Sequence, residues 1–169
     1  MKTQNNTLSV FLVDDDNMFL TSLKHKLHEK FKATIRISTF SNGEECLRKI
    51  EDKPDIVVLD YCLDSQPGNT LNGIEVLQKI KNASEKTEVV MLTGMEQQEL
   101  KESSFRLGAY EFLNKNATSA YEIQNTIKNI IHEIIVNRNA KENRQVNFIM
   151  GGVFLILAGL IIYLYLKYF

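Results

Sequence analysis

The sequence predicts an α/β fold, in which helices cover both faces of a doubly wound five-stranded parallel sheet, followed by one separate apolar helix. The first observation is that five strand-like segments alternate with five amphipathic helical segments. The second is that several strand segments are apolar throughout, as strands buried on both faces are. The third is a run without charge at 145–166. A length of 169 residues is enough for one ordinary domain and little more.

The first part of the chain supplies two predicted strands and the helix between them. Residues 8–13, LSVFLV, form a continuous apolar run that predicts a buried strand. Apolar residues at helical spacing follow over 17–30, and Asp16 is interpreted as the cap of that helix rather than as a ligand. Residues 33–40 alternate between apolar and polar, which predicts the second strand.

The middle of the chain continues the alternation. A Ser-Asn-Gly turn opens a short helix at 44–51, which Pro54 ends. The segment DIVVLD at 55–60 predicts another fully buried strand. Residues 73–81 place their apolar side chains on one helical face, and EVVML at 88–92 predicts the fourth strand.

The last predicted strand lies between two helices. Residues 96–107 predict a helix, and YEFL at 110–113 predicts the fifth strand. Ser119 and Glu122 are interpreted as a capping box that opens the final amphipathic helix. Strand–helix alternation implies right-handed crossovers and a parallel sheet, so one domain is expected over residues 8–137.

The uncharged run near the end of the chain predicts a transmembrane helix. Its core, residues 148–166, would be roughly 28 Å long as a helix, close to the roughly 30 Å of a bilayer's hydrocarbon core. The alternative is a buried core helix, which would need a large surrounding domain. Residues 138–147 are polar and are predicted to link the domain to the span.

Cations flank the apolar run unevenly. Arg138, Lys141 and Arg144 precede it, and Lys167 follows it. By the positive-inside rule this asymmetry predicts a single-pass membrane protein whose N-terminal domain is cytoplasmic.

Small residues recur on one face of the same apolar run, which makes a homodimer one expectation. Ordinary tolerance of small residues in a span is the alternative. The pairs, seven residues apart, are Gly151 with Ala158 and Gly152 with Gly159.

Composition limits the classes of partner. The formal net charge is −1, and no part of the chain is strongly basic, which argues against a nucleic-acid partner held by bulk charge. The two cysteines, Cys46 and Cys62, cannot form a disulfide framework, which favours a reducing compartment.

Candidate functional residues follow the predicted strands. Asp14 and Asp15 come after the first strand, Asp60 ends the third, Thr93 follows the fourth, and Lys115 lies two residues after the fifth. Sites in open α/β sheets lie beyond the carboxyl ends of the strands. Converging carboxylates repel one another unless a cation is present, and Mg²⁺ is the cation expected here. A lysine and a hydroxyl can contact phosphate oxygens, so the set is suited to phosphoryl transfer onto a carboxylate.

The chain over residues 8–137 resembles the receiver domain of two-component response regulators. The matching segments, in order, are FLVDDD, IVVLD, NGIEVLQKI, VVMLTG and GAYEFLNK. The resemblance implies a flavodoxin-like sheet in the order 2-1-3-4-5. It also implies a protein that accepts a phosphoryl group from a histidine kinase or a phosphotransfer protein and signals to a downstream protein target. Such a protein is not an enzyme beyond catalysing its own phosphorylation and dephosphorylation.

The resemblance also implies a role for each site residue. Phosphorylation is expected to draw the Thr93 hydroxyl toward the phosphoryl group and to turn Phe112 inward. The implied roles are Asp60 as phosphoacceptor, Asp14 and Asp15 as Mg²⁺ ligands together with Asp60 and the backbone carbonyl of Cys62, Lys115 as the site lysine, and Thr93 and Phe112 as the switch pair.

Two features depart from the family pattern. Members usually carry a proline with a cis bond after the lysine, whereas Asn116 stands here. A cis bond to a non-proline residue costs about 3–4 kcal/mol, so the turn is expected to differ. The loop at 61–72 is longer than usual, and a tolerated surface insertion is favoured over a role in shielding Asp60.

Two other function classes stay open. One is a receiver-like scaffold that works without phosphorylation. The other is a haloacid-dehalogenase-type phosphatase with Asp14 as nucleophile and Asp16 as acid. That family expects Thr or Val where Met18 stands, and the chain offers no obvious room for a cap domain.

Overall fold

The computed structural model describes residues 7–63, 71–94 and 98–168, with the side chains of 142, 143, 145, 146, 160, 161 and 164–166 left out. The chain divides into two compact units, Met1–Ile130 and Ile131–Phe169. The elements, in chain order, are β1 (Leu8–Val13), α1 (Asn17–Phe31), η1 (Lys32–Thr34), β2 (Ile35–Phe40), α2 (Gly43–Arg48), η2 (Ile50–Asp52), β3 (Ile56–Asp60), α3 (Gly73–Ala83), β4 (Glu88–Thr93), α4 (Gln98–Arg106), β5 (Glu111–Asn114) and α5 (Ser119–Tyr168).

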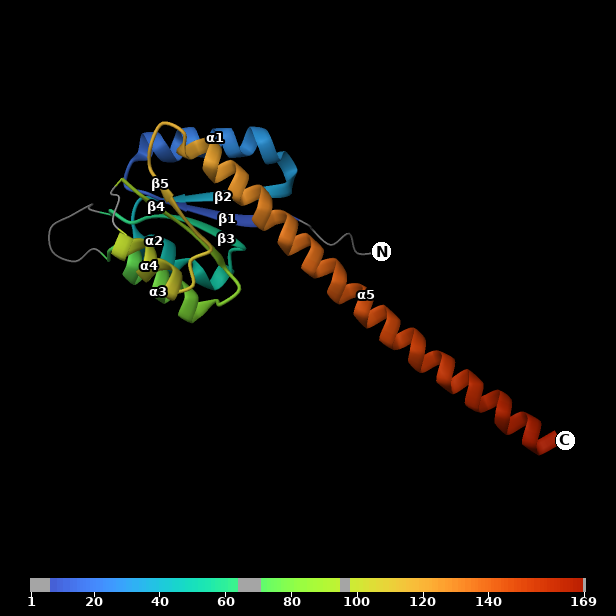
Figure 1. Cartoon of the computed structure of the whole chain (residues 1–169). Helices are drawn as coiled ribbons and strands as arrows, with labels where there is room; N and C mark the ends of the chain where they lie inside the picture. Colours follow the sequence, from blue (N-terminus) through green and yellow to red (C-terminus); the bar gives the residue numbers. More distant parts are fainter. Residues whose placement is uncertain (1–6, 64–70, 95–97, 169) are drawn as a thin grey trace. The chain divides into compact units, whose positions relative to one another are not determined.

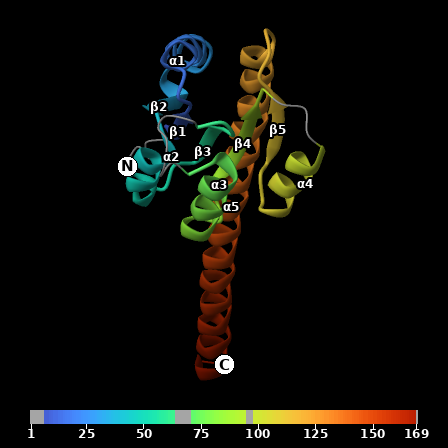
Figure 2. The same ribbon diagram turned by 90° about the vertical axis from the view of Figure 1, so that its left-hand side faces the viewer.

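The first unit is built on a five-stranded parallel sheet in the order β2-β1-β3-β4-β5 (Figures 1 and 2). This confirms the predicted α/β class and the strand order that the resemblance implied. The inner strands β1, β3 and β4 are mostly apolar because both of their faces are covered, and all five residues of β3 are buried. The edge strands β2 and β5 are more polar and only partly buried.

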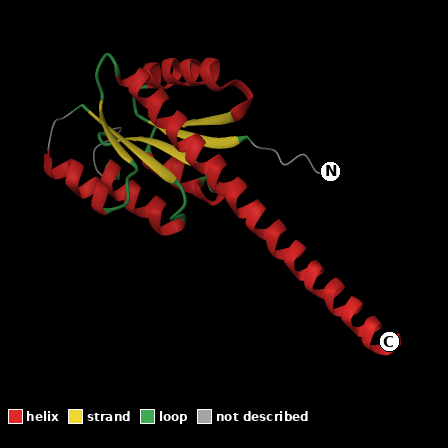
Figure 3. Ribbon diagram, turned by 45° about the vertical axis from the view of Figure 1, so that its right-hand side comes forward, coloured by secondary structure: helices red, strands yellow, loops and turns green. Residues whose placement is uncertain are grey.

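Two helical layers sandwich the sheet, with helices outside and strands inside (Figure 3). Alternate side chains of β1 point to opposite faces. Phe11 and Val13 join the core cluster formed with α2, α3 and α4, which includes Val76, Leu77 and Leu100. The other face is covered by α1 and by the part of α5 up to Ile130. There the buried side chains are Leu20, Leu23, Leu27, Ile123 and Ile127.

Some element boundaries differ from the predicted ones. The segment before β2 forms the short 3-10 turn η1, so the strand starts at Ile35 rather than at residue 33. The predicted helix at 44–51 stops at Arg48, and a separate 3-10 turn follows. Periodicity alone does not separate a 3-10 turn from the helix or strand beside it.

The capping box lies on a different helix from the one predicted. The side chains of Asn72 and Glu75 each accept a hydrogen bond from the other's backbone N–H at the start of α3. At the start of α5, Glu122 accepts from the Thr118 hydroxyl at 2.8 Å, while the hydroxyl of Ser119 is turned to Asn116. Asp16 caps α1, as predicted, by accepting from the N–H groups of Met18 and Phe19.

The predicted membrane span, and with it the predicted membrane location of the protein, is wrong for the part of the chain that the structure describes. None of its helices is both long enough and apolar enough to cross a bilayer. The prediction treated 148–166 as a helix of its own, whereas α5 is one helix that also contains the polar residues 138–147.

Candidate functional site

The parallel ladder brings the predicted site residues to one edge of the sheet. Val13 pairs with Leu59 and Asp60 with Leu92, so Asp14, Asp60 and Thr93 lie at the same end of their strands. Thr93 pairs with Asn114, and Lys115 follows it directly.

Lys115 is the centre of the site's charge contacts. Its ammonium nitrogen lies 2.7 Å from Oδ2 of Asp14 and 2.8 Å from Oδ2 of Asp60. The two carboxylates are almost fully buried, with 1% and 3% exposure, and the lysine reaches them from a partly exposed position. One cation is therefore shared between two buried anions, and the site carries excess negative charge.

Burial shifts the pKa values of the two carboxyls and of the lysine. It is the largest influence on Asp14 and Asp60, and it raises the pKa of both carboxyls even though the lysine acts in the opposite direction. For Lys115 burial alone lowers the pKa, but contact with the two carboxylates outweighs it and the pKa is raised. The site therefore keeps its lysine charged and resists holding two ionised carboxylates without a further cation.

The carboxylates fit a hard divalent cation. Asp14, Asp15 and Asp60 each offer an oxygen, and these oxygens all lie within 4.8 Å of one another. Oδ1 of Asp14 accepts from the Asp16 N–H at 2.9 Å, and its buried Oδ2 faces the Lys115 ammonium at 2.7 Å. Such an oxygen, beside the exposed Asp15, suits a cation that prefers oxygen ligands, as Mg²⁺ does.

Hydrogen bonds to β3, to α2 and between the two ends hold the start and the end of the long loop. The Cys62 N–H donates to Oδ1 of Asp60 at 3.3 Å, and the Gly73 N–H donates to the Tyr61 carbonyl at 3.0 Å. Leu71 donates its N–H to Glu44 at 2.9 Å. Residues 64–70, on which the predicted insertion centres, lie outside the described residues. The Cys62 carbonyl as a metal ligand stays a prediction.

The start of α3 comes against the backbone of the predicted acceptor. A Cβ added at Gly73 would lie 2.6 Å from the Asp60 carbonyl oxygen and 2.6 Å from the Cα of Tyr61. Real Cβ atoms do not approach backbone that closely, so this position requires glycine. Gly73 thereby lets α3 support the strand end that carries Asp60.

The proposed switch pair is buried. Thr93 is fully buried at the end of β4, and its carbonyl accepts from the Lys115 N–H at 2.6 Å. Phe112 is 8% exposed and packs in the core cluster with Met91 and Leu100. The expected inward turn of Phe112 therefore has little distance left to cover in this conformation.

Asn116 builds the turn after Lys115 by hydrogen bonding. Its side-chain oxygen accepts from the Thr118 N–H at 2.8 Å and from the Thr118 hydroxyl at 2.7 Å. Its N–H donates to the Ser119 hydroxyl at 3.1 Å. No cis peptide bond occurs among the described residues. The turn thus differs from the proline turn of the family, and Lys115 still reaches both carboxylates.

Sequence reasoning missed one contact residue. The Lys115 ammonium lies 4.8 Å from the centroid of the Phe19 ring, which is a cation–π distance. Phe19 is half-buried on the first turn of α1. Its apolar spacing marked it only as part of the helix's core face, and nothing in the pattern signals a contact with a lysine nearly a hundred residues later.

Comparison with known proteins agrees with this geometry. Residues 10–128 match the family model of the response regulator receiver domain. The chain is 31% identical over 123 residues to the alkaline phosphatase synthesis transcriptional regulatory protein PhoP of Bacillus subtilis, covering 72% of this chain and 48% of that protein. It is 29% identical over 119 residues to the photosynthetic apparatus regulatory protein RegA of Rhodobacter capsulatus, covering 70% and 60%. The chain therefore spans less than two thirds of the length of these relatives.

Solved structures show the same fold. A CheY-like receiver domain protein from Methanospirillum hungatei superposes with a TM-score of 0.66 at 23% identity, covering 75% of this chain and 95% of that one. The response regulator DrrB, a Thermotoga maritima OmpR/PhoB homologue, gives a TM-score of 0.64 at 26% identity, covering 75% and 54%.

Proposed function

Because the chain belongs to the response regulator receiver domain family, we propose that it accepts a phosphoryl group on Asp60 and signals through the conformational change that follows. The observation that carries the proposal is the placement of Asp60, which is buried at the end of β3 between a lysine and two further carboxylates. A related protein, the receiver domain of DrrB, has been solved in a BeF₃-activated form and is 27% identical to this chain.

Each site residue has a task in the transfer. A carboxylate oxygen of Asp60 attacks phosphorus in line with the leaving group, whose bond to phosphorus breaks as the new acyl phosphate bond forms. Lys115, now 2.8 Å from that carboxylate, offsets the charge that gathers on the phosphoryl oxygens. Thr93 then supplies a hydroxyl from the neighbouring strand, which can donate to a phosphoryl oxygen.

Asp14, Asp15 and Asp60 would hold Mg²⁺, with the Cys62 carbonyl as a further proposed ligand. A bound Mg²⁺ would neutralise the converging carboxylates and the incoming phosphoryl oxygens. This accounts for two buried carboxylates that share a single lysine, with a third carboxylate beside them.

The proposed donors are a histidine kinase or a phosphotransfer protein, and the proposed target is a protein. The expectation of no nucleic-acid partner stays a prediction, because the relative PhoP is named a transcriptional regulatory protein and this chain spans 48% of it. The phosphatase alternative is less well supported. Asp16, its required acid, is engaged as the cap of α1, and Asp14 is buried beneath Lys115.

Phosphoryl uptake from acetyl phosphate, followed by intact mass, tests the proposal. The wild-type chain should gain one phosphoryl group with Mg²⁺ and none with EDTA. Asp60→Asn should abolish uptake, and Asp15→Ala should abolish it by loss of the metal. The exposed Glu51→Gln is the matched control and should behave as wild type. Undiminished uptake by Asp60→Asn would refute the assignment, and uptake by no variant would favour the scaffold alternative.

A further inference from the structure

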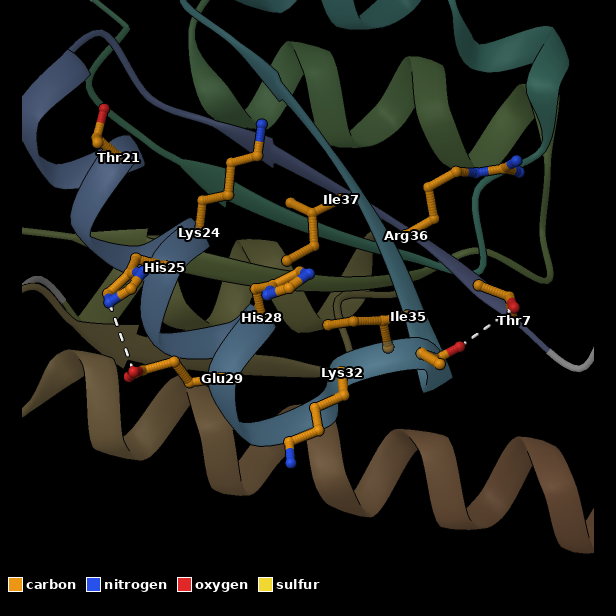
Figure 4. A pocket seen from close by; sticks show the side chains of 11 residues that line it. Thr7, Thr21, Lys24, His25, His28, Glu29, Lys32, Ile35, Arg36 and Ile37 are labelled. Atoms are coloured by element: carbon orange, nitrogen blue, oxygen red, sulfur yellow. Dashed lines mark hydrogen bonds and ion pairs between the residues drawn. The ribbon is translucent and has the colours of Figure 1, made fainter.

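A groove lies between α1 and the edge strand β2 (Figure 4), and its lining includes none of the strand-end carboxylates. Lys24 and His28 stand at i and i+4 along α1 and therefore share one side of the helix, and Lys32, which follows the end of the helix in η1, also lines the groove. Ile35 and Ile37 of β2 supply its apolar wall. Figure 4 shows His28 in the middle of the groove, beside these two isoleucines.

The charges around the groove are mostly positive. Lys24, Lys32 and Arg36 are exposed cations that line it. The one acidic residue of the lining, Glu29, lies 3.6 Å from His25 in the next turn of the same helix. Figure 4 shows the three cations spread along the groove and not converging on one point. A single small anion could not contact all of them, whereas an extended anionic chain could.

Strand β2 provides the second half of the argument. It pairs with β1 on one side, and no described strand pairs with its outer edge. An edge strand leaves every second pair of backbone N–H and C=O groups facing outward, ready to pair with another strand. The groove therefore combines unpaired backbone with flanking cations and an apolar wall.

We propose that this groove docks an extended acidic segment of a partner protein, which adds to the sheet as a strand beside β2. Backbone hydrogen bonds would supply much of the affinity, and carboxylates facing Lys24, Lys32 and Arg36 would supply the selectivity. A second copy of this chain is a poorer occupant, because pairing two β2 edges would place the same cations opposite one another. This docking is independent of phosphorylation on Asp60.

Fluorescence anisotropy with a labelled nonapeptide of alternating Glu and Val tests the proposal on the full chain. The Glu peptide should bind at least tenfold more tightly than the same peptide with Gln, and rising salt should weaken it. The double variant Lys24→Glu with Arg36→Glu should lose at least tenfold in affinity. Lys79→Glu with Lys101→Glu makes the same charge change at exposed positions on α3 and α4 and should bind as wild type.

N-methylated peptides separate strand addition from simple charge attraction. In an extended peptide, alternate backbone N–H groups point to opposite edges of the strand. One test peptide is methylated on the amides of one edge and a second peptide on those of the other edge, and both keep all their charges. One of them should lose binding while the other keeps it. Three binding results would overturn the proposal: equal binding by both methylated peptides, unchanged affinity in the variant with Lys24→Glu and Arg36→Glu, or equal binding of the Gln peptide. The proposal would also fail if the chain self-associates and the same double variant abolishes that self-association.

Discussion

Lys115 faces two carboxylates at 2.7 and 2.8 Å, and this shared contact defines the site at the scale of single residues. The acids and the lysine could be predicted from sequence because each follows an apolar run, and the ends of parallel strands meet at one edge. The contact between Phe19 and Lys115 could not be predicted from sequence, because it depends on how α1 packs against that edge. The Asn116 turn could be expected to differ, but its hydrogen bonds to Thr118 and Ser119 could not be foreseen.

The first prediction concerns stability without metal. Burial raises the pKa of Asp14 and Asp60 above the ordinary 3.8, so the folded state binds protons that the unfolded state releases. The stability from this source is complete below about pH 3.8 and is lost as the pH rises through the raised values. Asp60→Asn removes one of the two groups. In EDTA at pH 7 it should stabilise the protein by on the order of 1 kcal/mol, or roughly 2–8 °C in Tm.

Thermal melts between pH 4 and pH 8 measure this effect. The pH dependence should be flatter in Asp60→Asn than in wild type, and added Mg²⁺ should raise the Tm of wild type more. Asp52→Asn, an exposed acid in η2, is the control and should leave the profile unchanged. A lower Tm for Asp60→Asn at pH 7 would show that the Lys115 contact outweighs the burial of charge.

The second prediction concerns Phe19 as a positioning residue for Lys115. A cation–π contact at a partly exposed site contributes about 0.5–1 kcal/mol, so Phe19→Leu should slow phosphoryl uptake about two- to five-fold. Uptake should still reach one phosphoryl group per chain. The rate is measured by stopping the reaction at successive times and weighing the protein by intact mass. Met18→Leu, at the exposed neighbouring position, should keep the wild-type rate in the same measurement. An unchanged rate in Phe19→Leu contradicts the role.

At the scale of elements, the site depends on how α3 meets β3. Alanine is a better helix former than glycine by about 1 kcal/mol, yet a Cβ at Gly73 would press on the backbone of Asp60 and Tyr61. Gly73→Ala should therefore destabilise the fold by about 1–3 kcal/mol and slow uptake on Asp60. Gly94→Ala is the matched control, because an added Cβ there meets no described atom within 4 Å. Urea unfolding and uptake rates that are wild-type in Gly73→Ala would contradict this close approach.

The inner strands were the best predicted elements, because buried parallel strands are short and nearly continuous apolar runs. The edge strand β2 was predicted from its alternation instead, and its start was placed two residues too early. The 3-10 turns at Lys32–Thr34 and Ile50–Asp52 were not predicted, because they extend the pattern of the neighbouring element. The capping box was placed at Ser119 from its spacing alone, while the Asn72–Glu75 pair satisfies the same pattern with better geometry.

The second element-scale prediction concerns the ends of β4 and β5. Thr93→Val keeps the side-chain shape and removes the hydroxyl. The variant should still accept a phosphoryl group but lose most of the change in amide shifts over Glu88–Thr93 and Glu111–Asn114. Phe112 is already packed inside, so the change is expected at these strand ends. Amide shift changes equal to those of wild type would contradict the role of Thr93, and the exposed Thr39→Val serves as control.

At the scale of the whole molecule, all the predicted site residues lie in one of the two units, Met1–Ile130. The family match at 10–128 falls within that unit as well. The fold of this unit was predictable because strands and helices alternate five times along it. The span prediction weighed the absence of charge over 145–166 by itself, and it is wrong for the described residues, because none of their helices is long and apolar enough to cross a bilayer. The homodimer expected from the small residues of this run stays a prediction.

The most direct test of the central claim is to locate the phosphoryl group on the full chain. Borohydride reduces an aspartyl phosphate to homoserine, so reduction after acetyl phosphate treatment, followed by peptide mass spectrometry, marks the acceptor. The account predicts homoserine at position 60 and at no other aspartate, and only when Mg²⁺ is present. Homoserine at position 14, as the phosphatase alternative requires, or an unmodified Asp60 in protein that carries a phosphoryl group elsewhere, would contradict it.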